Sequence, residues 1–298
     1  MFFLISGFLF KTNDNFKNFF IKQFKRFIIP YYIFSIITYI FWITVGGRYG
    51  IGLISEIGYT KPLIGTILGL SHNDYLVHDI SLWFLYVLFL IEIIYFFLLK
   101  IKNIKIIVII SIILSFSGYF ISNILKMKLI YGIEKVLVGQ IFFLIGIILR
   151  RINYQVIIRN LNIYKIIYLT IIMVLINLFF LKINGFVDLV GNLFGNNYLI
   201  YILNGIVGSL IVINLSLIFE KTGISNRVFE IVSKSTIYIL GFHEQIISLI
   251  FGGIFVIFKI PPDTYKNIFL INIIISAGDC LLIAGIYYFV VKLKLKPS

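Results

Sequence analysis

The chain has 298 residues, of which 60% are hydrophobic and only 13% are charged, and its formal net charge is +14. A soluble domain typically has about 25% charged residues, so this composition excludes an ordinary soluble protein and indicates a membrane protein. The positive charge lies between the apolar stretches, as expected for the inner side of a membrane protein, and we therefore expect no nucleic-acid partner. Cys280 is the only cysteine, which excludes a disulfide framework and a cysteine-rich metal site.

The apolar residues gather in stretches long enough to cross a bilayer. A helix rises about 1.5 Å per residue, so about 20 apolar residues cross a hydrocarbon core of roughly 30 Å. In chain order we predict full spans at 27–45, 82–99, 105–123, 136–149, 165–181, 198–219, 235–258 and 267–291. The stretch Met1–Phe10 is apolar but half as long, like the second half of a span.

These stretches predict an all-α fold, a polytopic integral membrane helical bundle with about eight full spans and one partial N-terminal span. No run rich in Pro, Ser or Gly suggests a linker, so we predict a single transmembrane domain over residues 1–298. When the segment 11–26 is placed in the cytoplasm, 18 of the 26 Lys and Arg residues lie inside. This bias supports the predicted orientation.

Two of the outer loops of this topology, 46–81 and 182–197, are longer and chemically richer than the other loops. In the first loop His78 is followed by Asp79, a pair that could act as a base or bind a metal, although loop residues of this kind are more often solvated. His72 and Asp74 are open to the same two interpretations. Chemistry is therefore expected at the outer face or in a cavity that opens from it.

Polar residues within the spans are costly and are therefore candidates for function. His243 lies about eight residues into its span, about 12 Å along the helix. Its imidazole could act as a general base or bind a polar group, or it could be a structural histidine bonded to a neighbouring helix. Glu244 follows it, but Ile247 stands where a zinc motif needs a second histidine. The sequence therefore indicates no metal site.

Glu134 begins its span from the outside, where a carboxylate can simply stabilise the helix N-terminus through the helix dipole. Glu92 and Asp279 are weaker candidates within spans. On the inner side, Lys22 and Arg26 precede the first full span. They could anchor the inner interface or bind an anion such as the phosphates of a cytoplasmic donor, and Arg26 is the better candidate.

Several segments together resemble the membrane acyltransferase 3 family over residues 1 to about 250. The opening FFLISGFLF, followed by Lys25-Arg26-Phe27-Ile28-Ile29-Pro30-Tyr31, resembles the family's first motifs. Leu82-Trp83-Phe84-Leu85, EKVLVGQIFFLIGIILRR from Glu134, and Ser233 to His243 are similar to later ones. Asn184-Gly185-Phe186-Val187-Asp188-Leu189 followed by Gly195-Asn196 resembles a loop of the branch described as fucose 4-O-acetylase-like. The order and spacing of the segments make the resemblance specific.

The resemblance implies an O-acyltransferase that moves an acyl group, usually acetyl, from cytoplasmic acetyl-CoA to a hydroxyl of a cell-surface polysaccharide or its lipid-linked precursor. It implies no bound cofactor, with acyl-CoA as co-substrate and the lipid bilayer and a glycan as further partners, in the inner membrane of a bacterial cell. By resemblance, the catalytic residues are His243, Glu134 and Asp188. The residues that bind donor or acceptor are Arg26, Lys22, Asn184 and Trp83.

The chain departs from the family at its start. The family's best-known catalytic histidine lies in its first transmembrane helix, upstream of the segment that Met1–Phe10 resembles. If the chain is complete, we expect little or no transferase activity. The alternatives are therefore an inactive family member, a membrane partner of another enzyme, or a transporter or flippase of a glycan intermediate, although the internal repeats common in transporters are not evident.

Overall fold

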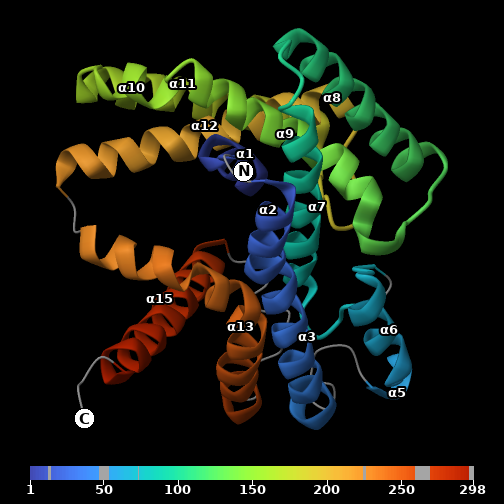
Figure 1. The fold of residues 1–298 in the computed structure, drawn as a ribbon. Coiled ribbons are helices and arrows are strands. Elements are labelled where there is room, and N and C mark those ends of the chain that lie inside the picture. The colour runs from blue at the N-terminus through green and yellow to red at the C-terminus, as the bar shows by residue number, and fades with distance from the viewer. Residues whose placement is uncertain (13–14, 47–53, 73, 224–225, 259–268, 295–298) are drawn as a thin grey trace. The chain divides into compact units, whose positions relative to one another are not determined.

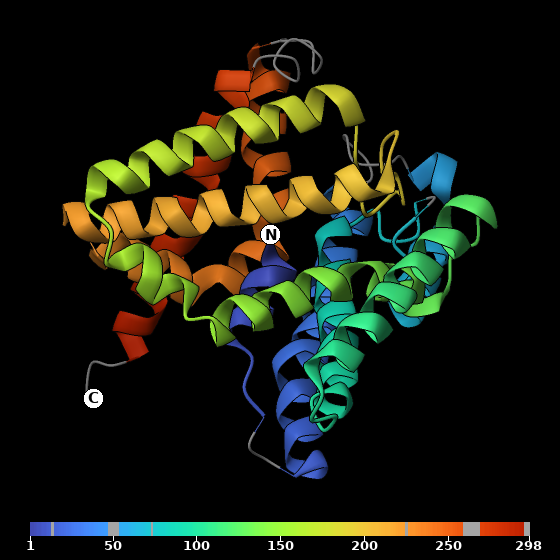
Figure 2. The same ribbon diagram turned by 90° about the horizontal axis from the view of Figure 1, so that it is seen from above.

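The computed structural model describes residues 1–12, 15–46, 54–72, 74–223, 226–258 and 269–294. Within these residues the regular structure is helical throughout, apart from an isolated β-bridge between Asp188 and Leu193 (Figures 1 and 2). The predicted all-α, polytopic membrane fold is therefore confirmed. The helices form two compact units, residues 1–27 with 86–224 and residues 28–85 with 225–298, and each is described separately below.

Seven of the predicted spans coincide with helices that are long and apolar enough to cross a membrane. Within the described residues these helices are Phe16–Val45, Ile80–Leu98, Ile104–Ile124, Ile130–Arg151, Ile163–Asn184, Tyr198–Thr222 and Asn272–Val291. The predicted span 235–258 lies in helix α13 (Asn226–Phe258), whose side chains are described as far as Ile246. Residues 267 and 268 of the last predicted span lie outside the described residues.

The helix of the first span begins earlier than the predicted residue 27, because much of the segment 11–26, expected to be a cytoplasmic loop, is helical. A continuous helical segment starts at Phe16, where the Asn15 side chain caps the helix by accepting the Asn18 backbone N–H at 2.9 Å. Its parts are α2 (Phe16–Gln23), the π-helical η1 (Phe24–Ile28), α3 (Ile29–Phe41) and the π-helical η2 (Trp42–Gly46). The wider π turn directly precedes Pro30, which cannot donate to the carbonyl four residues back and would crowd it in a regular α-helix. The helical segment therefore continues through residue 27, where the first span was predicted to begin.

The unit of residues 1–27 and 86–224 is built around α9, whose side chains are mostly buried. The helices α1 and α8 pack against α9, and α11 and α12 run side by side (Figures 1 and 2). The helices of this unit that follow residue 83 are α7 (Trp83–Leu98, from Tyr86 onward), α8 (Ile104–Tyr119), η4 (Phe120–Ile124), η5 (Ile130–Gly132), α9 (Ile133–Arg151), α10 (Tyr154–Arg159), α11 (Ile163–Asn184) and α12 (Tyr198–Thr222).

The short helix α1 (Phe2–Leu9) is an integral part of this unit because two glycines let it approach α9 closely. A Cβ atom on Gly146 of α9 would overlap the carbonyl oxygen of Leu4 on α1, and one on Gly7 would overlap the carbonyl oxygen of Phe143. Close backbone contact at small residues is the usual way in which helices pack within membranes.

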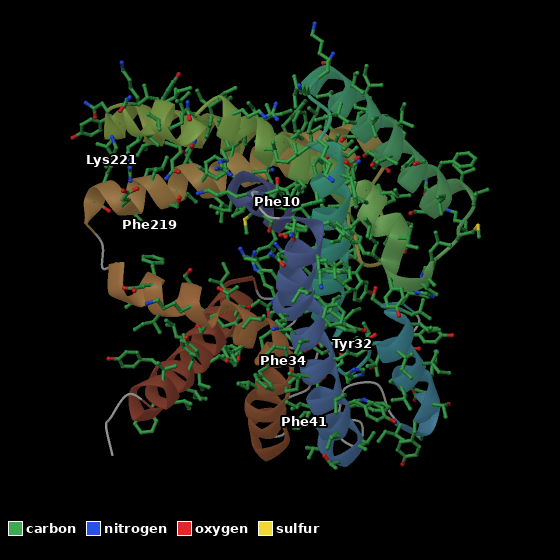
Figure 3. The ribbon with its side chains drawn as sticks, viewed as in Figure 1. Phe10, Tyr32, Phe34, Phe41, Phe219 and Lys221 are labelled. Atoms are coloured by element: carbon green, nitrogen blue, oxygen red, sulfur yellow. The ribbon has the colours of Figure 1, made fainter. Side chains whose placement is uncertain are left out.

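The unit of residues 28–85 and 225–298 gathers α3, α5 (Ile54–Ile57), α6 (Thr60–Leu68), η3 (Ile80–Leu82), α13 and α15 (Phe269–Lys294). The helix α13 packs along α15 and crosses α3. At this crossing the ring of Phe34, labelled in Figure 3, meets Tyr238 and Phe242 edge to face, with ring centroids 6.0 and 5.1 Å apart. The crossing positions the next turn of α13, which contains His243.

Candidate functional site

His243 lies half-buried on α13, and both of its ring nitrogens have partners. Nδ1 lies 3.0 Å from the carbonyl oxygen of Ile239. Because a carbonyl only accepts, we assign a proton to Nδ1, which leaves Nε2 as the basic nitrogen of the neutral ring. Nε2 lies 3.3 Å from the hydroxyl oxygen of Ser81. The ring is therefore fixed with its basic nitrogen directed at a hydroxyl group.

Glu244 holds the same hydroxyl from the other side. Ser81 Oγ donates to Glu244 Oε1 at 2.8 Å, and the other carboxylate oxygen, Oε2, accepts the backbone N–H of Ile80 at 3.3 Å. Glu244 thereby joins the start of η3 to α13. Sequence reasoning missed Ser81 because a single serine before an apolar run has no motif, and only the fold brings residues 81 and 243 together.

The contact between Ser81 and His243 also changes the expected depth of the first outer loop. The predicted topology puts Ser81 at the outer end of the span 82–99 and His243 about 12 Å from the inner end of its own span. Their side chains meet, so the predicted topology requires the end of this loop to reach below the outer ends of the spans.

His78 and Asp79, which the sequence suggested were solvated, are buried, with 2% and 0% of their surfaces exposed. This correction has a physical cause, because other polar groups of the unit bond to this segment. His78 Nε2 lies 3.2 Å from Thr66 Oγ1, and the His78 carbonyl oxygen accepts the Gln245 side-chain amide at 2.6 Å. The Thr66 carbonyl oxygen in turn accepts the hydroxyl of Tyr31 at 2.9 Å.

Burial changes the ionisation of these two residues in opposite senses. Burial lowers the pKa of His78 to about 4, so its ring is neutral at neutral pH. Burial, together with the nearby charge of Glu244, raises the pKa of Asp79 well above its ordinary value. The backbone N–H groups of Ser81 and Leu82 face this carboxyl group and oppose the shift, although neither carboxyl oxygen has a hydrogen bond of normal geometry.

A third carboxyl group lies near His243. Asp279 of α15 is buried and interacts electrostatically with the His243 ring. Within the described parts of the chain, no group of three or more His, Cys, Asp or Glu side chains has the arrangement of a metal site. Contacts and electrostatic interactions join Ser81, His243, Glu244, Asp79 and Asp279, and these five residues are called the acid–base cluster below.

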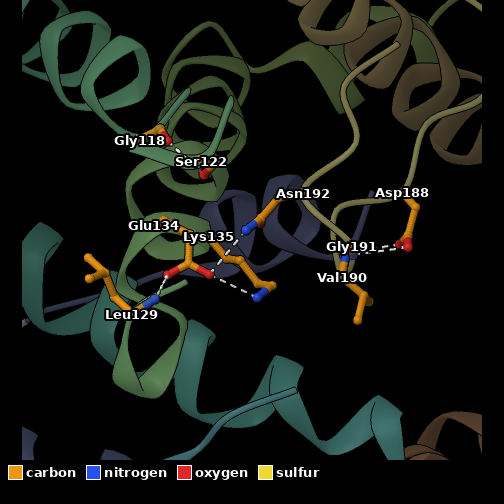
Figure 4. Close-up of polar contacts among 9 residues, drawn as sticks. All are labelled: Gly118, Ser122, Leu129, Glu134, Lys135, Asp188, Val190, Gly191 and Asn192. Carbon is orange, nitrogen blue, oxygen red and sulfur yellow. Dashed lines mark hydrogen bonds and ion pairs between the residues drawn. The ribbon is translucent and has the colours of Figure 1, made fainter. Parts of the chain in front are cut away.

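The other unit contains a second polar cluster around Glu134, which is fully buried (Figure 4). Its Oε1 accepts Lys135 Nζ at 2.9 Å and Asn192 Nδ2 at 3.3 Å, and its Oε2 accepts the Leu129 backbone N–H at 3.0 Å. Only 1% of the Lys135 side chain is exposed. Glu134 and Lys135 thus form a buried ion pair. Through Asn192, the Glu134 carboxylate also joins the loop 185–197 to the start of α9.

That loop, residues 185–197, holds Asp188, and Asn184 is the last residue of α11 directly before it. The Asp188 carboxylate accepts the backbone N–H groups of Val190 and Gly191, both at 2.9 Å (Figure 4). The Asn184 side chain donates to the Phe194 carbonyl at 2.9 Å and accepts the Asn197 N–H at 2.7 Å. These bonds shape the loop. Catalytic roles for Glu134 and Asp188, and a binding role for Asn184, remain predictions.

The inner candidates Lys22 and Arg26 lie exposed on α2 and η1. Both interact electrostatically with Glu92 of α7, which is 3% exposed, and the Arg26 guanidinium lies 4.9 Å from the ring centroid of Phe27. Trp83 is the first residue of α7 and packs edge to face on Phe84, with centroids 6.4 Å apart. The two exposed cations have the charge needed to bind an anionic donor.

Comparison with known proteins gives a single family match. The model of the acyltransferase 3 family, described as an acyltransferase domain, matches residues 1–288. No curated protein and no solved structure matches the chain.

Proposed function

We propose, from the premise that this chain belongs to the acyltransferase 3 family, that it is an O-acyltransferase of the bacterial inner membrane. The donor is cytoplasmic acyl-CoA, with acetyl as the acyl group, and the acceptor is a hydroxyl of a cell-surface polysaccharide or its lipid-linked precursor. The family supports membrane acyl transfer in general, and the donor, acceptor and acyl group are the parts that we propose.

The observation that carries the proposal is the setting of His243. His243 lies within the largely apolar helix α13. Its Nδ1–H is bonded to the carbonyl oxygen of Ile239, and its Nε2 is directed at the hydroxyl oxygen of Ser81. A neutral imidazole with one nitrogen fixed in this way can take a hydroxyl proton as the oxygen attacks a thioester carbonyl. The C–O bond then forms, the C–S bond breaks, and the proton passes to the thiolate of CoA.

The remaining roles follow from residue type and predicted side of the membrane. Arg26 and Lys22 supply positive charge for the phosphates of acyl-CoA on the inner side. Asn184 and Trp83 are assigned to the acceptor, since an amide group bonds sugar hydroxyls and an aromatic face packs on a sugar ring. Asp188 keeps the catalytic role that the resemblance implies. Glu134, on the same predicted outer side, keeps the catalytic role that the resemblance implies.

Acetyl ester content of the surface glycan tests the proposal. A strain lacking the gene is compared with the same strain carrying either the wild-type gene or His243→Asn, and acetate released by mild base is measured. We expect acetate to be lost on deletion, restored by the wild-type gene and not restored by His243→Asn. Unchanged acetate after deletion would argue against glycan acetylation, and restoration by His243→Asn would argue against His243 as the base.

A further inference from the structure

The hydroxyl group of Ser81 lies between two potential bases, and its single hydrogen is donated to one of them, Glu244. It lies 2.8 Å from Glu244 Oε1 and 3.3 Å from His243 Nε2, and both partners are on a different helix from Ser81. Ser81 is the middle residue of η3, whose N-cap position is occupied by Asp79, so its hydroxyl is not an N-cap group. A hydroxyl next to a histidine that is itself oriented by a third group is instead the arrangement of an activated nucleophile, and such distances are often longer in the absence of substrate.

The surroundings of Ser81 separate it from the other polar groups of this unit. Ser81, His243 and Glu244 are each only partly buried, whereas the neighbouring His78 and Asp79 are almost completely buried. Ser81 is therefore in a less enclosed position than the two residues that precede η3. The charged or titratable groups that face the cluster are Glu244 on α13, Asp79 before η3 and Asp279 on α15.

We propose that Ser81 is a covalent catalytic residue that carries the acyl group as an ester between donor and acceptor. This inference rests on the proposed function and adds a second step to it. It also suits the predicted topology, because the donor comes from inside and the acceptor from outside, and an acyl-serine allows them to react one after the other.

In the first half-reaction, the Ser81 hydroxyl turns its hydrogen from Glu244 Oε1 to His243 Nε2. Ser81 Oγ then attacks the thioester carbonyl carbon of acyl-CoA while this proton passes to Nε2. The Oγ–C bond forms, the C–S bond breaks, and the proton is delivered to sulfur, which gives acyl-Ser81 and the CoA thiol. In the second, an acceptor hydroxyl oxygen attacks the acyl-Ser81 carbonyl and His243 takes its proton. The bond to Oγ breaks and the proton returns to Ser81.

Glu244 acts through Ser81 and is a positioning residue. With one oxygen on the Ile80 N–H and the other on the Ser81 hydroxyl, it sets the distance between Oγ and His243. Replacement with Gln keeps an acceptor for one of these two bonds but removes the negative charge. The Glu244→Gln variant should therefore acylate more slowly and show a changed pH profile of acylation, which a purely structural anchor would not produce.

The test detects the acyl-enzyme directly and needs no acceptor. The full chain, purified in detergent, is incubated with radiolabelled acetyl-CoA, and the labelled peptide is identified by mass spectrometry. We expect one acetyl group on Ser81, no label in Ser81→Ala, and label again in Ser81→Cys as a thioester that hydroxylamine releases. His243→Asn should label about 10²- to 10⁴-fold more slowly. The control Ser235→Ala removes a buried hydroxyl of α13 that bonds only the Val232 carbonyl, and it should label like the wild type.

The outcomes separate this inference from the proposed function. If Ser81→Ala keeps the melting temperature of the wild type and still restores glycan acetylation, the acyl-serine is refuted while the acyltransferase function stands. Label on another residue in the wild type would equally refute it. If the wild-type protein neither acquires label nor restores glycan acetylation, both the proposed function and the acyl-serine are refuted.

Discussion

Replacement of Glu134 by Gln tests whether this buried carboxylate is a structural ion pair. The change leaves the Lys135 ammonium, which is 1% exposed, without its partner at 2.9 Å. Breaking a buried pair by removing one member typically costs about 3–5 kcal/mol, because an uncompensated charge remains. The single amide oxygen of Gln also cannot accept from both Leu129 and Asn192, as the carboxylate does. We therefore expect Glu134→Gln to lower the free energy of unfolding by at least about 3 kcal/mol.

Unfolding of the purified protein by SDS titration, in a fixed concentration of mild detergent, measures this loss. Adding Lys135→Met to Glu134→Gln removes the uncompensated charge and should recover most of it, leaving about 1–3 kcal/mol for the unpaired donor. Asp74→Asn is the matched control, because it breaks the exposed Lys61–Asp74 pair, with a bond of 3.2 Å, and should cost less than about 1 kcal/mol. Stability of Glu134→Gln within about 0.5 kcal/mol of the wild type would refute the reasoning.

The double variant also separates the two roles proposed for Glu134. If its stability returns and it restores acyl transfer, the carboxylate serves the fold. If its stability returns but transfer stays lost, the catalytic role suggested by the resemblance is supported.

Three further predictions concern packing, pH and the donor. Gly146→Ala should lower the free energy of unfolding by about 1–3 kcal/mol in the same SDS titration, because the new Cβ would overlap the Leu4 carbonyl. The control Gly285→Ala, whose Cβ meets open space, should leave the free energy of unfolding unchanged. Equal effects of the two changes would contradict the close α1–α9 contact. The pKa of His78 is about 4 in the folded protein and near 6.5 in the unfolded chain, so the free energy of unfolding should fall by about 3 kcal/mol as the pH drops from 7 to 4. In His78→Gln the melting temperature should fall less over this pH range. An unchanged dependence of the melting temperature on pH would argue against a buried neutral ring. Asp79, with its raised pKa, contributes in the opposite sense, since its stabilisation is lost as the pH rises. Arg26→Gln should raise the KM for acetyl-CoA about 10- to 100-fold with little change in kcat; Lys105→Gln is the control, and an unaltered KM in Arg26→Gln would exclude Arg26 as a donor ligand.

The spans and the importance of His243 could be predicted from the sequence because both depend on local composition. A run of about 20 apolar residues spans a bilayer wherever it occurs, and a histidine within such a run is costly and stands out. The predicted outer loop 182–197 was also visible as a polar segment, although its first three residues belong to α11. Its internal bonds at Asp188 could be anticipated only in kind, because aspartate commonly bonds backbone N–H groups two or three residues further on.

The errors have one common cause, which is that polar groups were judged without their tertiary partners. The segment 16–26 reads as a basic loop, yet it is helical because Asn15 caps it and one face packs on the rest of its unit through the buried Phe19 and Gln23. His78 reads as a solvated loop residue, yet it is buried, with its Nε2 next to Thr66 Oγ1 and its carbonyl oxygen bonded to the Gln245 amide. Ser81 and Glu244 gain their significance only from a contact across 163 positions of the chain.

The rate at which the purified protein releases CoA from acetyl-CoA, in the presence of glycan extracted from a strain lacking the gene, tests the central claim most directly. If His243 is the base of an acyl-CoA-dependent transferase, the wild type should release CoA and form acetyl esters at matching rates. His243→Asn, folded to the same melting temperature, should be about 10²- to 10⁴-fold slower in both. Rates for His243→Asn within about twofold of the wild type would contradict the role of His243, and CoA release without ester formation would contradict transfer to the glycan.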